Sequence, residues 1–452
     1  MKQITEDFIQ SNKLSVERYI SETGFESHFR TKTRSSISTC IDYLNSLILL
    51  PYRKNIRKMA IFCCKHSNNQ SLNHFLSNSS WSSAYLLKSV RTKTIKIIGI
   101  NGALILDESG IKKSGNYSVG VSRQYCGNQG KKENCQVGVF LAYVKEDKRM
   151  LIDERLYLPK KWINDKVRCL KAKVPPKEIR LRTKCELGLE MIDNAIEEGV
   201  PFSYVTMDGF YGRNPYLLSE IENRGLTFVA DIPVNTHVYI EEPVVGIPEK
   251  KGTRGRKPTV PKVLNTSSIT VESLSNSVEG WRLIKVRKTE RGYKEVYLKT
   301  MKVWRRQDEL PCKKPLWLLI SKDLESNEIK YSLCNASEDT SFDKLAKMQS
   351  SRYWIERAFQ DAKGNCGMAD YMVRNWNAWH HHMALVMLTM LILLSYQIKL
   401  NRMYKISLCG VILILKYHNP LRRIDAWEIA RILNQDNELR MRARKSRLKV
   451  SG

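Results

Sequence analysis

Two short apolar runs in the middle of the chain each end in an acidic residue. Residues 103–106 (ALIL) precede Asp107 and Glu108, and residues 204–207 (YVTM) precede Asp208 and a glycine-containing turn. A short apolar run bounded by turn residues is typical of a strand that is covered on both faces. Aspartate is also a common turn residue, so capping a turn is the simplest explanation of Asp107 when its stretch is considered alone.

The pattern of apolar positions changes along the chain and predicts five segments. Residues 1–95 combine periodic apolar positions with basic clusters and predict a helical domain, whereas residues 96–232 alternate short apolar runs with a helical stretch, which is an α/β pattern. Residues 233–340 predict a β-rich segment and residues 341–400 are helical again. Residues 401–452 predict a helical C-terminal region with a basic tail.

The charge of the chain indicates its partner. The 452 residues carry a formal net charge of +29, so a polyanion, and first of all nucleic acid, is expected to bind. The longest apolar stretch, residues 383–395, is shorter than the roughly 20 residues that span a membrane, and predicts a buried helix without membrane association. Eleven cysteines without a CxxC pair predict reduced thiols in a cytosolic setting and no zinc site, with Cys126 and Cys135 flanking a hairpin.

Three acidic residues form the candidate site. Parallel-type strands that end in Asp107 and Asp208 place both carboxylates at one edge of a sheet, where α/β proteins build their sites. On a helix, Arg352 and Lys363 fall within about 40° of Glu356, and an adjoining apolar stripe lets this helix pack on the sheet. The helix can therefore present Glu356 to the edge that carries the two aspartates.

Carboxylates that converge raise one another's pKa unless a cation neutralises them. Mg²⁺ is a hard cation that binds one or two protein carboxylates together with water and phosphate oxygens. Two such ions about 4 Å apart activate a water or a 3′-hydroxyl and stabilise the leaving oxygen in an in-line displacement at phosphorus. An acidic pocket in a basic chain therefore suits DNA that is held by its backbone and cut by metal chemistry.

Five blocks of the sequence together resemble one enzyme family. They are LDESGIKKSG from residue 106, GVSRQYCGNQGKKENCQVGVF from residue 120, LIDERLYLP from residue 151, VTMDGFYG from residue 205 and WIERAFQDAKGNCGMADYMVRNWNAWHHHMAL from residue 354. The family is that of the DDE transposases of bacterial insertion sequences, and the most similar group is the one numbered seven hundred and one, a relative of family four. The resemblance covers most of the chain.

The resemblance implies a fold and a set of metal ligands. The fold is α/β, with an RNase H-like catalytic domain formed by residues 96–232 and residues 341–400, and a helical N-terminal DNA-binding domain. In this family the first Asp, the second Asp and the Glu hold two divalent ions, which correspond here to Asp107, Asp208 and Glu356. The ions are expected to be Mg²⁺, with Mn²⁺ as a substitute.

The resemblance also implies an insertion and a phosphate-binding motif. The long interval between Asp208 and Glu356 is similar to that of relatives with a β-rich insertion domain before the helix that carries the glutamate. In the family motif Arg352 and Lys363 match positions that hold phosphates beside the scissile bond. The Tyr position of the motif is Gln349 in this chain, which can donate a hydrogen bond to DNA but cannot stack on a base.

Basic clusters elsewhere predict further DNA contacts. The cluster Arg53, Lys54, Arg57 and Lys58 fits a helix laid near a groove, with a solvated helix face as the alternative. The basic loop of the β-rich segment resembles a minor-groove hook, and non-specific phosphate contact explains it equally well. The candidate residues of this loop are Arg254, Arg256 and Lys257.

Neighbouring residues are weighed against these candidates. Adjacent residues of a strand point to opposite faces, so only one of Asp107 and Glu108 can reach the metals, and Asp107 is preferred. The run His380–His382 fans around a helix, which favours a surface or DNA-facing role over chelation. Trp376 and Trp379 are expected to pack against the sheet.

The sequence therefore predicts a transposase that cuts the ends of its own insertion element and joins the freed 3′-hydroxyls to target DNA. The expected partner is double-stranded DNA, in the form of terminal inverted repeats and target DNA. The resemblance further implies a homodimer in the synaptic complex and a bacterial cytoplasmic, nucleoid-associated location. Two alternatives remain open: a catalytically silent DNA-binding regulator, and a simple metal-dependent nuclease without strand transfer.

Overall fold

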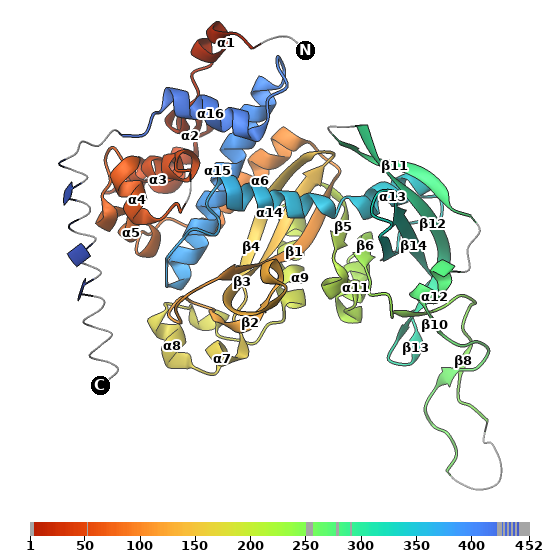
Figure 1. Cartoon of the computed structure of the whole chain (residues 1–452). Helices are drawn as coiled ribbons and strands as arrows, with labels where there is room; N and C mark the ends of the chain where they lie inside the picture. Colours follow the sequence, from red (N-terminus) through yellow and green to blue (C-terminus); the bar gives the residue numbers. More distant parts are fainter. Residues whose placement is uncertain are drawn as a thin grey trace. The chain divides into compact units, whose positions relative to one another are not determined.

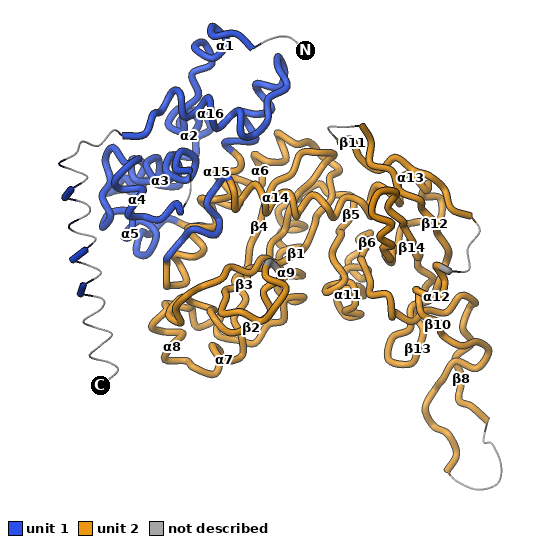
Figure 2. The backbone as a smooth tube through the Cα atoms, viewed as in Figure 1, with its two compact units in different colours: residues 1–81, 365–372, 392–452 blue, residues 82–364, 373–391 orange. Residues whose placement is uncertain are grey.

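A computed structural model of the chain describes residues 4–51, 53–249, 256–276, 280–289 and 292–422, together with scattered residues between 427 and 442 (Figure 1). The chain divides into two compact units (Figure 2). Unit 1 comprises residues 1–81, 365–372 and 392–452, and unit 2 comprises residues 82–364 and 373–391. Each unit is thus assembled from segments that are distant in the sequence.

Unit 1 is helical in the part that the structure describes. Its ends are tied together by hydrogen bonds to the backbone, because the side chain of His418 bonds to the Ile9 carbonyl at 3.0 Å and Asn419 donates to the Leu14 carbonyl at 3.1 Å. Its helices are α1 (Glu6–Ser11), α2 (Val16–Thr23), η1 (Phe25–Phe29), α3 (Ile37–Leu49), α4 (Ile56–Phe62), α5 (Asn69–Ser77) and α16 (Leu408–His418).

The N-terminal unit ends at Trp81, before the helix α6 (Ser83–Ile98), which belongs to unit 2. Helix α6 is bound to other parts of unit 2 through Arg91, whose guanidinium binds both carboxylate oxygens of Glu198 at 2.7 Å and donates to the Ile152 carbonyl at 3.0 Å. The compact unit therefore differs from the predicted segment 1–95 at its C-terminal boundary, and it also includes the end of the chain.

Unit 2 is a mixed α/β structure built on one large mixed sheet. Within the described residues this sheet has 13 strands, in the order β10-β7-β12-β14-β15-β6-β5-β1-β3-β2, with β11 and β13 on β12 and β4 on β3. The strands are β1 (Gly102–Lys112), β2 (Ser122–Cys126), β3 (Lys131–Lys145), β4 (Lys148–Leu156), β5 (Phe202–Met207), β6 (Phe228–Asp231), β7 (His237–Tyr239), β10 (Ile269–Thr270), β11 (Arg282–Thr289), β12 (Gly292–Gln307), β13 (Leu310–Pro311), β14 (Leu316–Asp323) and β15 (Ile329–Cys334).

The centre of the sheet positions the candidate site. β1 pairs antiparallel with β3 and parallel with β5, and β5 pairs parallel with β6. Helix α9 (Lys184–Glu197) lies close against β1, since a Cβ atom on Gly188 would be 2.5 Å from Leu106. The remaining helices of unit 2 are α7 (Lys160–Ile163), α8 (Lys166–Lys171), α10 (Gly209–Gly212), α11 (Pro215–Asn223), α12 (Val271–Asn276), α13 (Phe342–Ser350) and α14 (Tyr353–Asn365), with the short turns η2 (Gly127–Gln129) and η3 (Pro176–Glu178).

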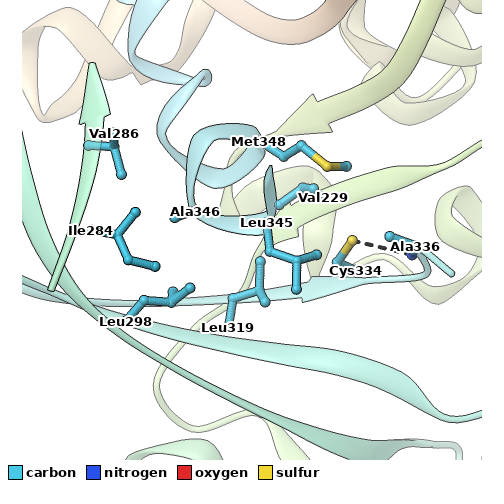
Figure 3. Packing of buried hydrophobic residues seen from close by; sticks show 10 residues of the cluster. All are labelled: Val229, Ile284, Val286, Leu298, Leu319, Cys334, Ala336, Leu345, Ala346 and Met348. Carbon is cyan, nitrogen blue, oxygen red and sulfur yellow. Dashed lines mark hydrogen bonds between the residues drawn. The ribbon is translucent and has the colours of Figure 1, made fainter. Parts of the chain in front are cut away.

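The described residues between 233 and 340 are rich in β-strands, and these strands continue the central sheet through the antiparallel pairing of β15 with β6. Helix α13 packs on these strands and buries Leu345, Ala346 and Met348 against Ile284, Leu298 and Leu319 (Figure 3). The short hairpin of β8 (Val245–Gly246) and β9 (Lys262–Val263) projects from the rest of unit 2 (Figure 1).

Helix α15 (Trp376–Leu400) is the one helix among the described residues that is long and apolar enough to cross a membrane. Of its most apolar 18-residue window, 78% is buried inside the protein. The helix thus packs as a core element, which confirms the buried helix that the sequence predicted for residues 383–395.

Candidate active site

The last pair of the parallel ladder between β1 and β5 brings Asp107 and Asp208 into neighbouring positions. Leu106 on β1 is paired with Met207 on β5, so the residue that follows each of them is an aspartate. β1 continues beyond this point to Lys112 with β3 as its partner, whereas the chain leaves β5 at Asp208. Asp208 caps α10, because its Oδ1 accepts hydrogen bonds from two backbone N–H groups, those of residues 210 and 211.

The carboxyl group of Asp107 lies in an unfavourable environment for its negative charge. Burial raises the pKa of Asp107 to about 7, and the charge of Asp208 contributes to that rise, whereas the backbone N–H of Glu108 and the charge of Arg352 oppose it. The backbone nitrogen of Glu108 is 2.6 Å from Oδ1 of Asp107. Two neighbouring acids of this kind need a cation to be ionised together near neutral pH.

Glu356 is bound to an arginine in the structure. In the structure Nη2 of Arg352 is 2.8 Å from Oε1 of Glu356, and Nε of Arg352 is 2.8 Å from Oδ2 of Asp231. Arg352 lies in the turn just before α14, and Glu356 is in the first turn of that helix. The side chain of Glu356 is 53% exposed.

The three predicted carboxylates do not form a closed set of ligands. In the part of the chain that the structure describes, no three His, Cys, Asp or Glu side chains are arranged to hold a metal ion. The oxygen donors of Asp107 and Asp208 nevertheless have the chemistry that hard divalent cations prefer.

The two other residues of the predicted phosphate-binding motif differ in their placement. Lys363 is half-buried. Burial lowers the pKa of its ammonium group, and the charges of Cys126 and Asp107 oppose that shift. Gln349 is buried, and its Nε2 donates to Ser332 Oγ at 2.8 Å. This placement corrects the predicted DNA contact of Gln349, because its amide is used inside the protein.

Asp231 is a residue that the sequence reasoning missed. It ends β6, and Ser332 on β15 is its register partner and donates a hydrogen bond from Oγ to Oδ1 at 2.6 Å. Burial raises the pKa of Asp231, and the charge of Arg352 opposes that shift. The run FVAD, residues 228–231, repeats the signal that marked Asp107 and Asp208, an apolar strand that ends in aspartate.

Glu108, the neighbour of Asp107, is neutralised by a lysine. Nζ of Lys184 on α9 is 2.6 Å from Oε1 of Glu108. The hydroxyl of Tyr211 lies 3.5 Å from the other carboxylate oxygen. This pairing is consistent with the choice of Asp107 as the residue available to a metal ion.

The histidine run is not on the surface. His381 is 5% and His382 0% exposed, and Nδ1 of His380 lies 2.7 Å from Oε1 of the buried Glu154 on β4. The predicted surface or DNA-facing role is therefore wrong, because this end of α15 packs on the sheet. Trp379 is 1% exposed, as expected for packing.

Two of the cysteines lie on the predicted hairpin. Cys126 and Cys135 lie on β2 and β3, which form an antiparallel hairpin, so the predicted hairpin is confirmed. All eleven cysteines are free thiols in the structure.

The N-terminal basic cluster is only partly available to a ligand. Lys54 is 4% exposed, and its Nζ donates to the carbonyls of Leu47 and Asn365, both at 2.5 Å. This corrects the predicted DNA contact of Lys54, since its ammonium group is satisfied inside unit 1. Arg53 is exposed, and Arg57 and Lys58 on α4 are half-buried.

The basic loop between β8 and β9 is described in part. Arg256 and Lys257 are exposed. Arg254 lies outside the described residues.

Comparisons with known proteins agree on one class of enzyme. A family model described as DDE superfamily endonuclease matches residues 24–293, more than half of the chain. The match includes Asp107 and Asp208 and ends before Glu356. A probable transposase for insertion sequence element IS701 from Microchaete diplosiphon is 29% identical over 181 residues, which are 38% of this chain and 43% of that protein. The chain thus matches less than half of the length of this relative.

One solved structure is more distantly similar. The cryo-EM structure of the piggyBac transposase synaptic complex with hairpin DNA aligns with a TM-score of 0.39 and 12% identity, over 92% of this chain and 78% of that chain. A TM-score this low does not establish a common fold.

Proposed function

Because this chain belongs to the DDE superfamily endonucleases, we propose that it is the transposase of an insertion sequence. It cuts the ends of its own element and joins the freed 3′-hydroxyls to target DNA. The observation that carries the proposal is the parallel pairing of Leu106 with Met207, which makes Asp107 and Asp208 neighbours at the ends of two buried runs. The partial match to a probable insertion-sequence transposase supports the same reaction.

The catalytic fold in this proposal is RNase H-like. Its supporting observation is the strand order β4-β3-β1-β5-β6, in which three antiparallel strands are followed by two strands parallel to β1. Ligands of open α/β sheets bind at the ends of the parallel strands, and Asp107 and Asp208 lie at that place.

Asp107, Asp208 and Glu356 hold two Mg²⁺ ions in this proposal, with Mn²⁺ as a substitute. Bound divalent ions activate the attacking oxygen and stabilise the leaving oxygen in phosphoryl transfer. The raised pKa of Asp107 supports the assignment, because an acid with a raised pKa beside a second acid gains most from a neutralising cation. Arg352 and Lys363 orient the phosphates of the DNA beside these carboxylates.

The DNA contacts outside the site come from two basic regions. Residues 1–95 recognise the terminal inverted repeats through a helical module, with Arg53, Arg57 and Lys58 as candidate contacts. Arg256 and Lys257 on the projecting hairpin contact phosphates. Both regions serve an enzyme that works on DNA in the bacterial cytoplasm, at the nucleoid.

The two ends of an insertion element are matching sites, which suits a symmetric pair of protein copies. We therefore assign a homodimer to the synaptic complex. Light scattering of the protein with and without end DNA measures this stoichiometry. A single copy on two joined ends contradicts it.

The test of the proposed function is cleavage of element-end DNA by the full-length protein in Mg²⁺. The variants Asp107→Asn, Asp208→Asn and Glu356→Gln are expected to abolish cleavage and to retain end binding in Ca²⁺. Gln360→Ala, an exposed change on the same helix as Glu356, is the matched control and keeps full activity. Full cleavage by one of the three acidic variants removes that residue from the site.

A second assay separates the proposed function from its alternatives. Joining of labelled element ends to a plasmid is expected of a transposase. Cleavage without joining identifies a simple nuclease. End binding by the wild-type protein without cleavage in Mg²⁺ or Mn²⁺ identifies a silent regulator.

A further inference from the structure

One side chain of β15, the last strand of the β-rich segment, contacts Asp231 beside the candidate site. Ser332 on β15 lies opposite Asp231 on β6, and its hydroxyl donates to Oδ1 of Asp231 at 2.6 Å. The same hydroxyl accepts a hydrogen bond from Nε2 of Gln349 on α13 at 2.8 Å. One oxygen of Asp231 is therefore fixed from the side of the β-rich segment.

The other oxygen of Asp231 holds Arg352. Nε of Arg352 is 2.8 Å from Oδ2 of Asp231, and Nη2 is 2.8 Å from Glu356. A guanidinium is a planar fork, so its orientation at one partner determines what it presents to the next. The side chains of Asp231 and Arg352 are 19% and 18% exposed, against 53% for Glu356, so Asp231 is the inner partner and Glu356 the outer one.

The backbone of Asp231 is also tied to the strand end that carries Asp208. Asp208 caps α10, and Gly212 at the end of this four-residue helix lies against the carbonyl of Asp231 so closely that a Cβ atom there would be 2.0 Å from the oxygen. A shift of Asp231 therefore requires a shift of the element that begins at Asp208.

We propose that Asp231 is a positioning residue that holds Arg352 in place, so that Arg352 retains Glu356 until a DNA phosphate replaces the glutamate. The proposal rests on the proposed function for the identity of that phosphate. Carboxylate and phosphate compete for the same fork of a guanidinium, because both accept two parallel N–H bonds. Phosphate binding at Arg352 then releases the exposed Glu356 toward Asp107 and Asp208, and the β-rich segment supports the active site through Ser332.

This arrangement explains why the three carboxylates are not gathered in the DNA-free protein. Arg352 neutralises the charge of Glu356. The repulsion between Asp107 and Asp208 is therefore not strengthened by a third carboxylate. The order of events is DNA first and the complete set of carboxylates second.

The first test is a double-mutant cycle in single-turnover cleavage of element-end DNA. Asp231→Asn is expected to slow cleavage by about 10- to 100-fold, the usual range for a residue that orients the groups around a metal without binding the metal. Its affinity for end DNA in Ca²⁺ is expected to be unchanged. Added to Arg352→Ala, Asp231→Asn is expected to have no further effect, because it acts through Arg352. An equal further loss in that background overturns the proposal, since Asp231 then acts on its own.

Two other variants make this cycle specific. Ser332→Ala keeps the charge of Asp231 and is expected to slow cleavage in the same direction by a smaller factor, and it serves as the test if Asp231→Asn does not fold. Asp323→Asn is the matched control, because Asp323 also ends a strand of the same sheet and is paired with Lys294 at 2.6 Å. A loss of cleavage in Asp323→Asn equal to that of Asp231→Asn means a general role of the sheet and contradicts the proposal.

The second test does not use activity. Mn²⁺ binding to the DNA-free protein is titrated by calorimetry for the wild type, Arg352→Ala and Asp231→Asn. Arg352→Ala frees Glu356 and is expected to bind Mn²⁺ more tightly than the wild type. Asp231→Asn loosens the hold of Arg352 on Glu356 and is expected to bind Mn²⁺ more tightly than the wild type by a smaller factor. No tighter binding by Arg352→Ala than by the wild type overturns the proposed retention of Glu356, and no tighter binding by Asp231→Asn overturns the positioning role of Asp231.

These outcomes are separate from the fate of the proposed function. If Asp107→Asn cleaves normally, the metal site itself is misassigned, whatever the cycle shows. If Asp107→Asn is inactive and the cycle is additive, the metal site stands and the role of Asp231 fails.

Discussion

A Cβ atom on Gly212 would lie 2.0 Å from the backbone carbonyl oxygen of Asp231, so no side chain fits at Gly212. This close approach joins the short helix that Asp208 caps to the end of β6. Two of the acidic residues at the candidate site are thus held at a set separation by a glycine.

Gly212→Ala is therefore expected to lower the free energy of unfolding by about 1–3 kcal/mol, the usual cost of overpacking. It is also expected to slow cleavage of end DNA, because the methyl group moves Asp208 or Asp231 away from its place. Thermal unfolding and single-turnover cleavage measure the two effects.

Gly209→Ala is the control for that change. Gly209 lies in the same helix, and a Cβ atom there has its closest neighbour, the same carbonyl oxygen, at 3.8 Å, which is an ordinary van der Waals distance. This variant is expected to retain the wild-type stability and rate. Equal behaviour of the two glycine variants contradicts the role of the close approach at Gly212.

The stability of the metal-free protein is expected to fall as the pH rises, through Asp107. The pKa of Asp107 is raised from 3.8 to about 7, first by burial and then by Asp208, so the folded state binds this proton more tightly than the unfolded chain. The contribution of the protonated group is complete below about pH 4 and is lost as the pH passes through about 7.

Asp107→Asn removes this titration. In EDTA its melting temperature is expected to exceed that of the wild type by a margin that grows from about pH 4 to about pH 7.5 and then levels off. Mg²⁺ is expected to raise the melting temperature of the wild type more than that of the variant at about pH 7.5, because it binds the ionised carboxylate. If the difference in melting temperature between Asp107→Asn and the wild type does not change with pH, Asp107 is not the source of the pH dependence.

The sequence predicts those parts of the site that depend on a local pattern, here an apolar strand followed by an aspartate. Residues 103–106 and 204–207 are strand residues, as predicted. The prediction that both strands end at their aspartates is correct for Asp208 and wrong for Asp107, because β1 continues to Lys112 with β3 as its partner. The same pattern at residues 228–231 marks Asp231 and was available in the sequence. Its partner Ser332 was not, because the pairing of β15 with β6 joins residues about a hundred positions apart and leaves no local signal.

Gln349 and Lys54 show how burial reverses the interpretation of a polar residue. Gln349 shares the buried face of α13 with Leu345, four residues before it, so helical periodicity alone indicates an inward side chain. The family motif placed it instead on DNA. Lys54 lies in a basic cluster, and the charge pattern of that cluster contains nothing about the two carbonyls that its ammonium group binds.

Lys54→Ala is expected to act on stability and not on DNA binding. It leaves the carbonyls of Leu47 and Asn365 without this donor, which costs about 1–3 kcal/mol for buried groups. Lys58→Ala, a half-buried position of the same cluster, is the control and is expected to change stability by less than about 0.5 kcal/mol.

The two lysine variants are compared by chemical denaturation and by binding to end DNA at a temperature where both are folded. Weaker DNA binding is expected for Lys58→Ala, and binding equal to the wild type for Lys54→Ala. If Lys54→Ala weakens DNA binding and Lys58→Ala does not, Lys54 contacts DNA after all.

The last prediction concerns the projecting hairpin, where Arg256 and Lys257 are exposed. A cation that neutralises a phosphate of duplex DNA releases condensed counterions, and each such cation contributes about 0.9 to the slope of log affinity against log salt. The double variant Arg256→Ala and Lys257→Ala is therefore expected to reduce that slope by nearly two, equally for repeat and random DNA. The matched control is the pair Lys313→Ala and Lys314→Ala, which removes the same charge from two exposed lysines of the β-rich segment outside that hairpin. If both double variants reduce the slope equally, net charge alone attracts the DNA. If the Arg256→Ala and Lys257→Ala variant binds only repeat DNA more weakly, the hairpin recognises the base sequence.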